Sequence, residues 1–303
     1  MLSKLQKRYI IGIISYTVSI FIWRINESFG NVFRTNLILS ITTDVKIPIE
    51  NNEEKGFLSA KIITSEESKN IQKRNVLIII NHGFSDTIET YQYLYIPLAL
   101  NGYTLLSYDS RGIGRSKSLG NRYEFEKRIQ DFKDIVKWVQ SEEELKQMSI
   151  YTIGFSIGAM VSLIGGFQNK SIKKLIAISS ISSYKRSIKN MNPVVLLMYF
   201  LKKVPLFISD ETGEKLSPAY TFFKSKQKYS NSDWHKLKER VMLIHSKNDK
   251  VTPFENFKEN SNILNLKLSN KLIFKKGGHS MKKNEIEIVG SILYFLNKKI
   301  EEY

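Results

Sequence analysis

The sequence contains no cysteine among its 303 residues. Disulfide bonds, metal sites with thiolate ligands and a cysteine nucleophile are therefore excluded. The lack of disulfides does not separate an exported protein from an intracellular one, because exported proteins without them are common. No internal repeat is evident either, and the length suits one large domain with an appendage.

Acidic residues are few relative to basic ones: 29 Asp and Glu stand against 46 Lys and Arg, a net charge of +17. Such a charge suits nucleic acid, an anionic membrane or an acidic substrate, or simply reflects a lysine-rich composition. The basic residues are spread along the chain without a recognisable nucleic-acid-binding module, so we expect no nucleic-acid partner. The hydrophobic content of 42% is typical of a folded globular protein.

A stretch near the amino terminus, Tyr9–Trp23, has no charged residue and follows Lys4, Lys7 and Arg8. A full membrane span needs about 20 residues, although flanking Lys and Arg side chains shorten that requirement. We therefore expect residues 1–30 to form an uncleaved membrane anchor, with the amino end inside and the body extracytoplasmic. The alternatives are a signal peptide, cleaved to give a secreted protein, and a buried helix.

Residues 31–303 read as one α/β domain. The continuous apolar run Val76–Ile80 is typical of a strand buried on both faces of a parallel sheet. Further strands are expected at 37–47, 57–64, 103–108, 148–153, 173–180, 241–245 and 271–274, with helices between most of them. This alternation predicts a mostly parallel, doubly wound sheet with helices on both faces. Residues 181–239 lose the alternation, which indicates an inserted cap.

The pentapeptide Gly154-Phe155-Ser156-Ile157-Gly158 lies between an expected strand and an expected helix. A serine with glycines two residues before and two residues after it fits a nucleophile elbow, a strained turn from which the hydroxyl projects. A Cβ at either glycine would collide with neighbouring backbone. The pattern therefore predicts that Ser156 is a nucleophile, although an ordinary glycine-containing turn would give the same five letters.

A serine hydroxyl is a weak nucleophile until a general base takes its proton, so the elbow predicts a histidine. The chain has four: His82, His235, His245 and His279. His245 is the last residue of an expected buried strand, and His235 lies in the expected cap without a neighbouring loop. His82 precedes the serine, at a strand end suited to binding an oxyanion. His279 follows two glycines between the last strand and the last helix, so it is the best candidate for the base.

The imidazole of a catalytic histidine needs a carboxylate to fix its tautomer. Asp249 follows the preceding strand directly and is the expected acid. The chain order Ser156, Asp249, His279 is the order that the nucleophile-elbow architecture requires. Asp210 and Asp233 are the alternatives for the acid.

On these stretches, the chain resembles the α/β-hydrolase superfamily over roughly residues 55–300. The motifs that match are Asn81-His82-Gly83-Phe84, Asp109 to Ser116, the pentapeptide around Ser156, His245 to Pro253, and Gly278-His279. The resemblance implies that the backbone N–H groups of Phe84 and Ile157 bind the oxyanion. It also implies that the Asp109–Ser116 turn is structural. With its apolar amino-terminal segment and short cap, the chain is similar to membrane-anchored, esterase- or lipase-like members.

The expected function is therefore cleavage of carboxylic esters, with an apolar or lipid-like acyl group, by a serine hydrolase without a metal or cofactor. Peptidase, amidase or thioesterase activity, or a non-catalytic binding role, are the alternatives. The cap is the only stretch that gives information about the substrate. Its apolar run Pro193–Leu201 lies among Lys and Arg residues, and no acidic residue occurs between 181 and 209. This run either meets anionic lipid or simply packs over the active site.

Overall fold

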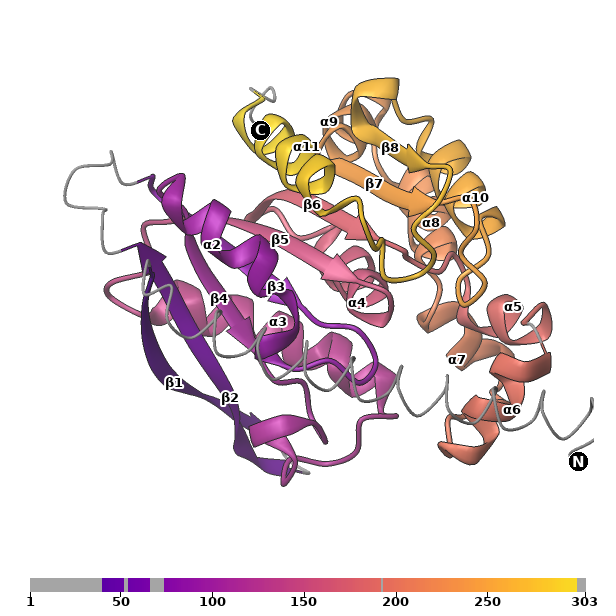
Figure 1. The fold of residues 1–303 in the computed structure, drawn as a ribbon, viewed down its shortest axis with the longest axis horizontal. Helices are drawn as coiled ribbons and strands as arrows, with labels where there is room; N and C mark the ends of the chain where they lie inside the picture. The colour runs from indigo at the N-terminus through magenta and orange to yellow at the C-terminus, as the bar shows by residue number, and fades with distance from the viewer. Residues whose placement is uncertain (1–39, 52–53, 66–73, 192, 299–303) are drawn as a thin grey trace, which may run out of the picture. The chain divides into compact units, whose positions relative to one another are not determined.

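The computed structural model describes residues 40–51, 54–65, 74–191 and 193–298. Its central feature is an eight-stranded sheet with the strand order β1-β2-β4-β3-β5-β6-β7-β8 (Figure 1). The strands are β1 (Ser40–Asn51), β2 (Glu54–Ser65), β3 (Val76–Asn81), β4 (Thr104–Tyr108), β5 (Ser149–Phe155), β6 (Ile172–Ile178), β7 (Val241–Ser246) and β8 (Lys271–Phe274). The segment predicted to be an anchor or signal, residues 1–30, lies outside the described residues.

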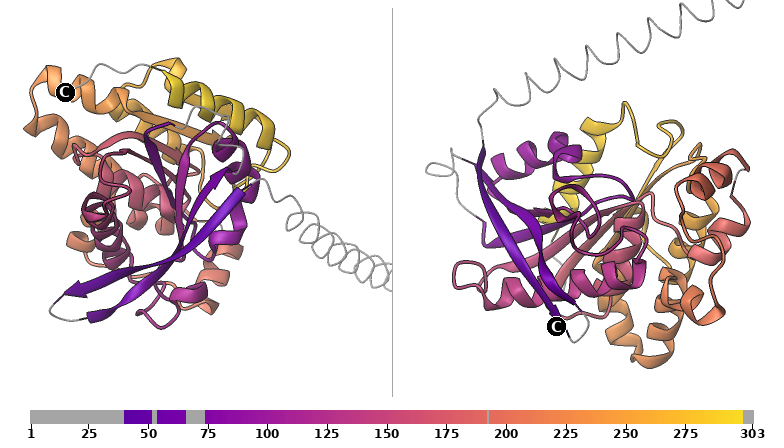
Figure 2. Two further views of the ribbon diagram at one scale, coloured as in Figure 1. Left: turned by 90° about the vertical axis from the view of Figure 1, so that its left-hand side faces the viewer. Right: turned by 90° about the horizontal axis from the view of Figure 1, so that it is seen from below.

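The pairing of the strands confirms the predicted mostly parallel sheet. Strands β3 to β8 pair in parallel, and β2 pairs antiparallel with β4. The strands fan out with the usual twist, as the two additional views show (Figure 2). Because β5 to β8 are parallel neighbours, their carboxyl ends and the loops that follow them meet at one edge of the sheet.

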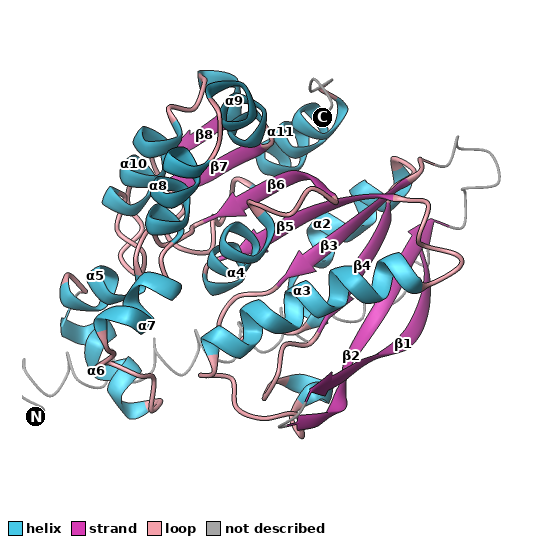
Figure 3. Cartoon of the chain, turned by 180° about the vertical axis from the view of Figure 1, so that it is seen from behind, coloured by secondary structure: helices cyan, strands magenta, loops and turns pink. Residues whose placement is uncertain are grey.

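Helices cover both faces of the sheet (Figure 3). One face packs against α3 (Phe125–Ser141), α4 (Ile157–Gly166), α8 (Pro218–Lys228), α9 (Asn231–Glu239) and α10 (Glu255–Leu264). The other face packs against α2 (Gln92–Leu100) and α11 (Glu285–Asn297). This is the doubly wound arrangement that the alternation of strands and helices predicts.

Side chains of the central strands alternate between the two cores. In β3, Leu77 and Ile79 enter the core under α3 and α4, whereas Ile78 and Ile80 enter the core under α2 and α11. A strand buried on both faces therefore has no polar positions, which explains the continuous apolar run in the sequence.

The stretch 181–239 is helical and has two parts. Helices α5 (Tyr184–Lys189), α6 (Pro193–Leu201) and α7 (Asp210–Lys215) lie beyond the carboxyl ends of the central strands (Figure 1). Helix α8 instead contacts α4 and α10, and α9 contacts β7. The later part of this stretch is thus packed on the main body, and only α5 to α7 are in the position expected of a cap.

Two local features complete the described elements. The helix after β3 begins as a 3₁₀ turn, η2 (Ile88–Tyr91), before α2. Strands β1 and β2 extend almost to each other along the chain. Within the described ranges, no helix is both long enough and apolar enough to span a bilayer.

Candidate active site

Ser156 lies between β5 and α4 in a backbone conformation that serine rarely adopts. Its φ is 54° and its ψ is −117°. Its backbone N–H donates to the carbonyl oxygen of Ile178 in β6 over 2.8 Å, which fixes the turn to the neighbouring strand. The hydroxyl does not cap α4, so it is available for other partners. Strain of this kind, about 1–3 kcal/mol, is typical of functional sites.

The two flanking glycines are required by close backbone contacts. A Cβ on Gly154 would lie 2.5 Å from the carbonyl oxygen of Gly158, and a Cβ on Gly158 would lie 2.1 Å from the carbonyl oxygen of Asn81. Real Cβ atoms do not approach backbone so closely. The steric reason for the glycine spacing is therefore the one expected from the sequence.

The structure brings Ser156, His279 and Asp249 together. Nε2 of His279 lies 2.9 Å from Oγ of Ser156, and Nδ1 of the same ring lies 2.8 Å from Oδ2 of Asp249. The side chain of Asp249 is fully buried, whereas that of His279 is 26% exposed. A histidine held between a serine hydroxyl and a buried carboxylate is able to move a proton from the hydroxyl.

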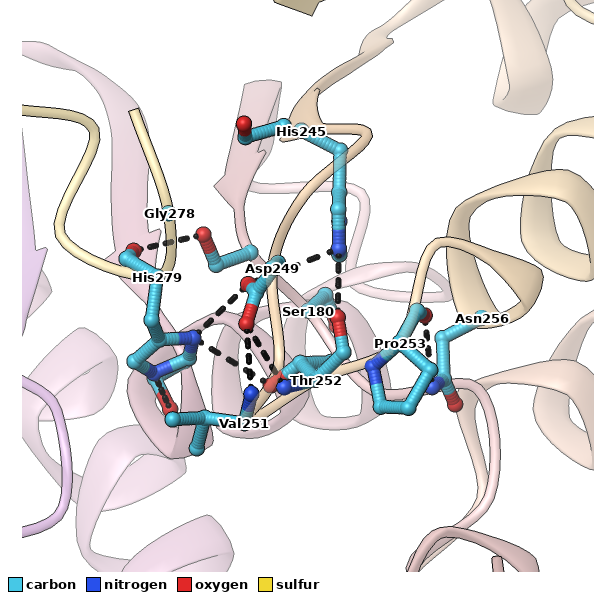
Figure 4. A network of polar contacts seen from close by, with 12 residues as sticks. Ser180, His245, Asp249, Val251, Thr252, Pro253, Asn256, Gly278 and His279 are labelled. Atoms are coloured by element: carbon cyan, nitrogen blue, oxygen red, sulfur yellow. Dashed lines mark hydrogen bonds and ion pairs between the residues drawn. The ribbon is translucent and has the colours of Figure 1, made fainter. Parts of the chain in front are cut away.

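Asp249 is held in place by the loop that follows β7 (Figure 4). Its Oδ1 accepts hydrogen bonds from the backbone N–H groups of Val251 at 2.9 Å and Thr252 at 2.8 Å. Its Oδ2 is left for His279. The carboxylate is thus buried but fully hydrogen-bonded, as a buried charge has to be.

The loop that carries His279 is tied to two other strand ends. The carbonyl oxygen of His279 accepts a hydrogen bond from Oγ of Ser179 over 3.0 Å, at the end of β6. The backbone N–H of Gly278 donates to the side-chain oxygen of Asn248 over 2.9 Å, after β7. Ser179 itself has a φ of 52°. Sequence reasoning missed both side chains, because nothing local marks them as supports for a loop far along the chain.

The other three histidines are placed differently. His245 is buried, lies with Nε2 2.8 Å from the carbonyl oxygen of Thr252, and has its pKa lowered mainly by burial. This agrees with the structural role expected for it. It also lies 3.6 Å from the Asp249 carboxylate, on the side away from His279 (Figure 4). His235 is half exposed on α9, where Glu239 is its charged neighbour.

His82 is fully buried, and its Nε2 lies 2.8 Å from Oγ of Ser107. Burial, with a smaller contribution from Arg128, lowers its pKa from 6.5 to about 3. The ring is therefore neutral at physiological pH and lies inside the fold.

Phe84 and Ile157, the oxyanion donors expected from the sequence, are both close to Ser156 in the fold. Ile157 follows Ser156 as the first residue of α4, and Phe84 lines the same cavity as Ser156. Within the described part of the chain, no hydrogen bond occupies the backbone N–H of either residue. The guanidinium of Arg128 in α3 donates to the carbonyl oxygens of His82 at 3.0 Å and Gly83 at 3.3 Å. This buried arginine fixes the turn, and no local pattern in the sequence marks it for that role.

A cavity of about 480 Å³ opens beside the serine. Its apolar lining includes Tyr91, Phe155, Ile178, Val195, Met198 and Tyr199. Ser156 and His279 also line this cavity, so a substrate bound in it would contact both residues. A larger cavity of about 630 Å³ lies against α3 and α8, but its lining includes neither Ser156 nor His279.

Asp86 is a second acidic group at the cavity and was not singled out in the sequence. It accepts a hydrogen bond from the hydroxyl of Tyr91 over 2.5 Å. Burial, followed by the charge of Asp86, raises the pKa of that hydroxyl, so Tyr91 stays protonated. The structure therefore adds a negative charge within the candidate binding site.

The turn from Asp109 to Ser116 is structural. Asp109 accepts hydrogen bonds from the backbone N–H groups of Ile88 and Arg115, and Arg111 pairs with Asp131 and Glu54. In the part of the chain that is described, no cluster of three or more His, Asp or Glu side chains is arranged to hold a metal ion.

Comparisons with known proteins bear on the family and on the fold. The sequence model of the family described as "Serine aminopeptidase, S33" matches residues 72–211. A comparison with curated proteins finds no match.

Three solved structures illustrate the similarity of fold. An acylaminoacyl peptidase from Pyrococcus horikoshii has a TM-score of 0.63 and 20% identity, covering 90% of this chain and 44% of that one. An esterase from Pyrococcus furiosus has a TM-score of 0.58 and 22% identity, covering 86% of this chain and 92% of that one. A puromycin-hydrolyzing peptidase from Mycobacterium tuberculosis has a TM-score of 0.61 and 14% identity, covering 88% and 41%. The chain thus spans less than half the length of either peptidase, and at these identities the likeness concerns the fold.

Proposed function

We propose that the chain is a serine hydrolase of the α/β-hydrolase superfamily that acts through Ser156, His279 and Asp249. The single observation that carries the proposal is the placement of His279 between the Ser156 hydroxyl and the Asp249 carboxylate, with hydrogen-bond distances on both sides. All three groups lie at the carboxyl edge of the sheet, which is where ligands bind in folds of this kind.

In the proposed reaction, Oγ of Ser156 attacks the substrate carbonyl carbon while Nε2 of His279 takes the hydroxyl proton. The backbone N–H groups of Phe84 and Ile157 bind the oxygen that becomes negatively charged. Donors of this kind supply about 10²–10³ in rate each. His279 then gives its proton to the leaving group, which departs and leaves an acyl group on Ser156. Water, deprotonated by His279, releases the acid and restores the serine.

An ester with an apolar acyl group is the substrate class that the cavity favours. Its wall beside Ser156 combines aromatic and aliphatic side chains from three elements, with Phe155 from β5, Ile178 from β6 and Met198 from α6. An acyl chain that leaves water for such a wall gains roughly 0.8 kcal/mol for each CH₂ group buried. Turnover of p-nitrophenyl esters should therefore rise with acyl length until the cavity is filled.

A peptide with a free amino group is the second candidate, and Asp86 is the observation that favours it. A carboxylate at the cavity wall suits a protonated amine, and the family model that matches is described as an aminopeptidase. Asp86→Asn should reduce cleavage of aminoacyl anilides selectively if peptides are the substrates. If esters are the substrates, the parent enzyme should cleave anilides with a free amine no better than those with a blocked amine.

Covalent labelling with a fluorophosphonate tests the proposal directly. The parent protein should be labelled, and Ser156→Ala should abolish labelling while the thermal melt stays within a few degrees. Ser180→Ala, which removes a buried hydroxyl from the next strand end, is the matched control and should still be labelled. Labelling of Ser156→Ala at the parent rate would rule out Ser156 as the nucleophile.

A further inference from the structure

Helix α6, with the sequence PVVLLMYFL, contains no charged residue and none of its described side chains is fully buried. Its inner face contributes Val195, Met198 and Tyr199 to the cavity beside Ser156. The Tyr199 ring stacks on Phe84 with 6.1 Å between the ring centroids. The inner face thus packs over the candidate active site, which is one of the two roles expected for this run from the sequence.

The outer face of α6 is apolar and exposed to solvent. Leu197 is 58% exposed, Phe200 67% and Leu201 71%, and Phe207 in the following loop is 97% exposed. Single exposed apolar side chains are ordinary, but several on one short helix form a patch of the kind that marks an interaction site. Packing over the candidate active site therefore explains the apolar residues on the inner face of α6 but not those on its outer face.

The charged residues between 181 and 209, which flank α6, are all basic, whereas α7 carries Asp210, Glu211 and Glu214. Lys189, Lys202 and Lys203 are exposed and form no ion pair within the described residues. Lys185 and Arg186, by contrast, each form an ion pair. Their partners are Asp210 and Glu259. Fewer unpaired basic residues therefore flank α6 than the sequence alone indicates.

We propose that the outer face of α6 docks on the surface of an anionic lipid bilayer, with Lys189, Lys202 and Lys203 among the headgroups. An apolar surface with lysines at its edges suits an anionic bilayer, because the apolar side chains enter the lipid while the lysines meet the headgroups. A second copy of the chain fits less well, because it would place the same lysines close to one another. The proposal concerns binding alone, so it is independent of whether Ser156 is the nucleophile.

The absence of cysteine allows a direct test with the full chain. An environment-sensitive fluorophore is attached to Leu197→Cys, and separately to Leu268→Cys as the control. Leu268 is 86% exposed and precedes β8, at the opposite edge of the sheet from Ser156. Each labelled protein is mixed with neutral phosphatidylcholine vesicles or with vesicles that contain anionic phosphatidylserine, and the access of acrylamide to the fluorophore is measured.

On anionic vesicles, the label on Leu197→Cys should shift to shorter wavelength and be protected from acrylamide, whereas the label on Leu268→Cys should remain accessible. Changing Lys189, Lys202 and Lys203 to Gln should weaken binding to the vesicles. The vesicle concentration needed for half-maximal protection should rise by about fivefold for each lysine removed. The matched change of Lys224, Lys226 and Lys228 to Gln removes three exposed lysines from α8 and should leave protection unchanged.

Two results would overturn the proposal. One is equal accessibility of the two labels on anionic vesicles at low salt. The other is protection of the label on Leu197→Cys without vesicles that depends on protein concentration, because that outcome identifies a second copy of the chain as the occupant. Fluorophosphonate labelling of the same samples reports Ser156 separately, so a failure of docking is distinguishable from a failure of catalysis.

Discussion

Asp249 uses its two carboxylate oxygens for different partners: Oδ1 accepts two backbone N–H groups and Oδ2 faces His279. In Asp249→Asn, the amide oxygen would remain with the backbone donors, so the amide NH₂ would face the ring. His279 would then adopt the tautomer with a proton on Nε2, which cannot accept the proton of Ser156. We expect turnover to fall by about 10⁴-fold with little change in the thermal melt.

The controls for this substitution are Asp210→Asn and Asp233→Asn. Asp210 is exposed and pairs with Lys185, and Asp233 accepts from Ser230 at the start of α9. Both variants should keep parent turnover. Loss of turnover in either one, with survival in Asp249→Asn, would mean that Asp249 is not the acid.

His82 makes the stability of the fold sensitive to acid. Its pKa in the fold is about 3, below the ordinary value of 6.5, because it is buried and close to Arg128. Between these values the unfolded chain binds a proton that the folded chain does not, so stability falls as pH falls. The loss is at most about 1.4 kcal/mol for each pH unit. His82→Gln should therefore show a shallower dependence of the unfolding free energy on pH between 6 and 4, whatever its stability at pH 7. Parallel slopes for parent and variant would contradict the assignment.

At the scale of an element, the contact between α4 and β3 depends on Gly158. A Cβ there would meet the carbonyl oxygen of Asn81 at 2.1 Å and that of His82 at 2.4 Å. Gly158→Ala should therefore cost roughly 3 kcal/mol of unfolding free energy in urea titrations, the upper end of the usual range for overpacking. It should also reduce fluorophosphonate labelling, since the turn before Phe84 has to move.

Gly290→Ala is the matched control in another helix. Gly290 lies in α11, and a Cβ there would have no atom within 4 Å. Alanine restricts the unfolded chain and favours the helix, so this variant should gain about 0.5–1 kcal/mol. Similar losses in both variants would show that helix flexibility, rather than the contact with β3, explains the effect at Gly158.

The order of strands and helices could be predicted from the sequence because each element has its own local pattern. Buried strands such as β3 are continuous apolar runs, and α3 has an apolar stripe at helical spacing. The packing of α8 on α4 and α10 could not be predicted in this way. An amphipathic pattern shows that a helix has an apolar face, but it does not say which surface covers that face.

Residues of the candidate site could be predicted from the sequence where the expected reaction allows few residue types at a given place in the chain. Ser156, Asp249 and His279 follow from a steric motif and from the need for a base and an acid in a known chain order. Arg128 and Asp86 are different, because an arginine in a helix and an aspartate in a loop are common on surfaces. Only the fold shows that one is buried against the carbonyl oxygens of the His82–Gly83 turn and that the other lines the cavity.

At the scale of the whole molecule, the amino-terminal segment bears on where the protein is located. The apolar segment Tyr9–Trp23 lies outside the described residues, and we propose that it anchors the chain in a membrane with the catalytic body extracytoplasmic. Full-length protein should then stay with the membrane after carbonate extraction, and protease added outside intact cells should reach the body. A secreted chain that begins near residue 31 would identify a signal peptide instead, and a full-length protein released by carbonate would contradict both readings.

The site is assembled from loops after β5, β7 and β8, and 123 positions of the chain separate Ser156 from His279. At a synthesis rate of about 5–20 residues per second, the serine precedes its histidine by about 6–25 s. Until the loop after β8 is made and tied to Ser179 and Asn248, Ser156 lacks the histidine that we propose as its base. If Ser156 is the nucleophile, a nascent chain carries an inert serine, and reactivity begins only once the loop after β8 is in place.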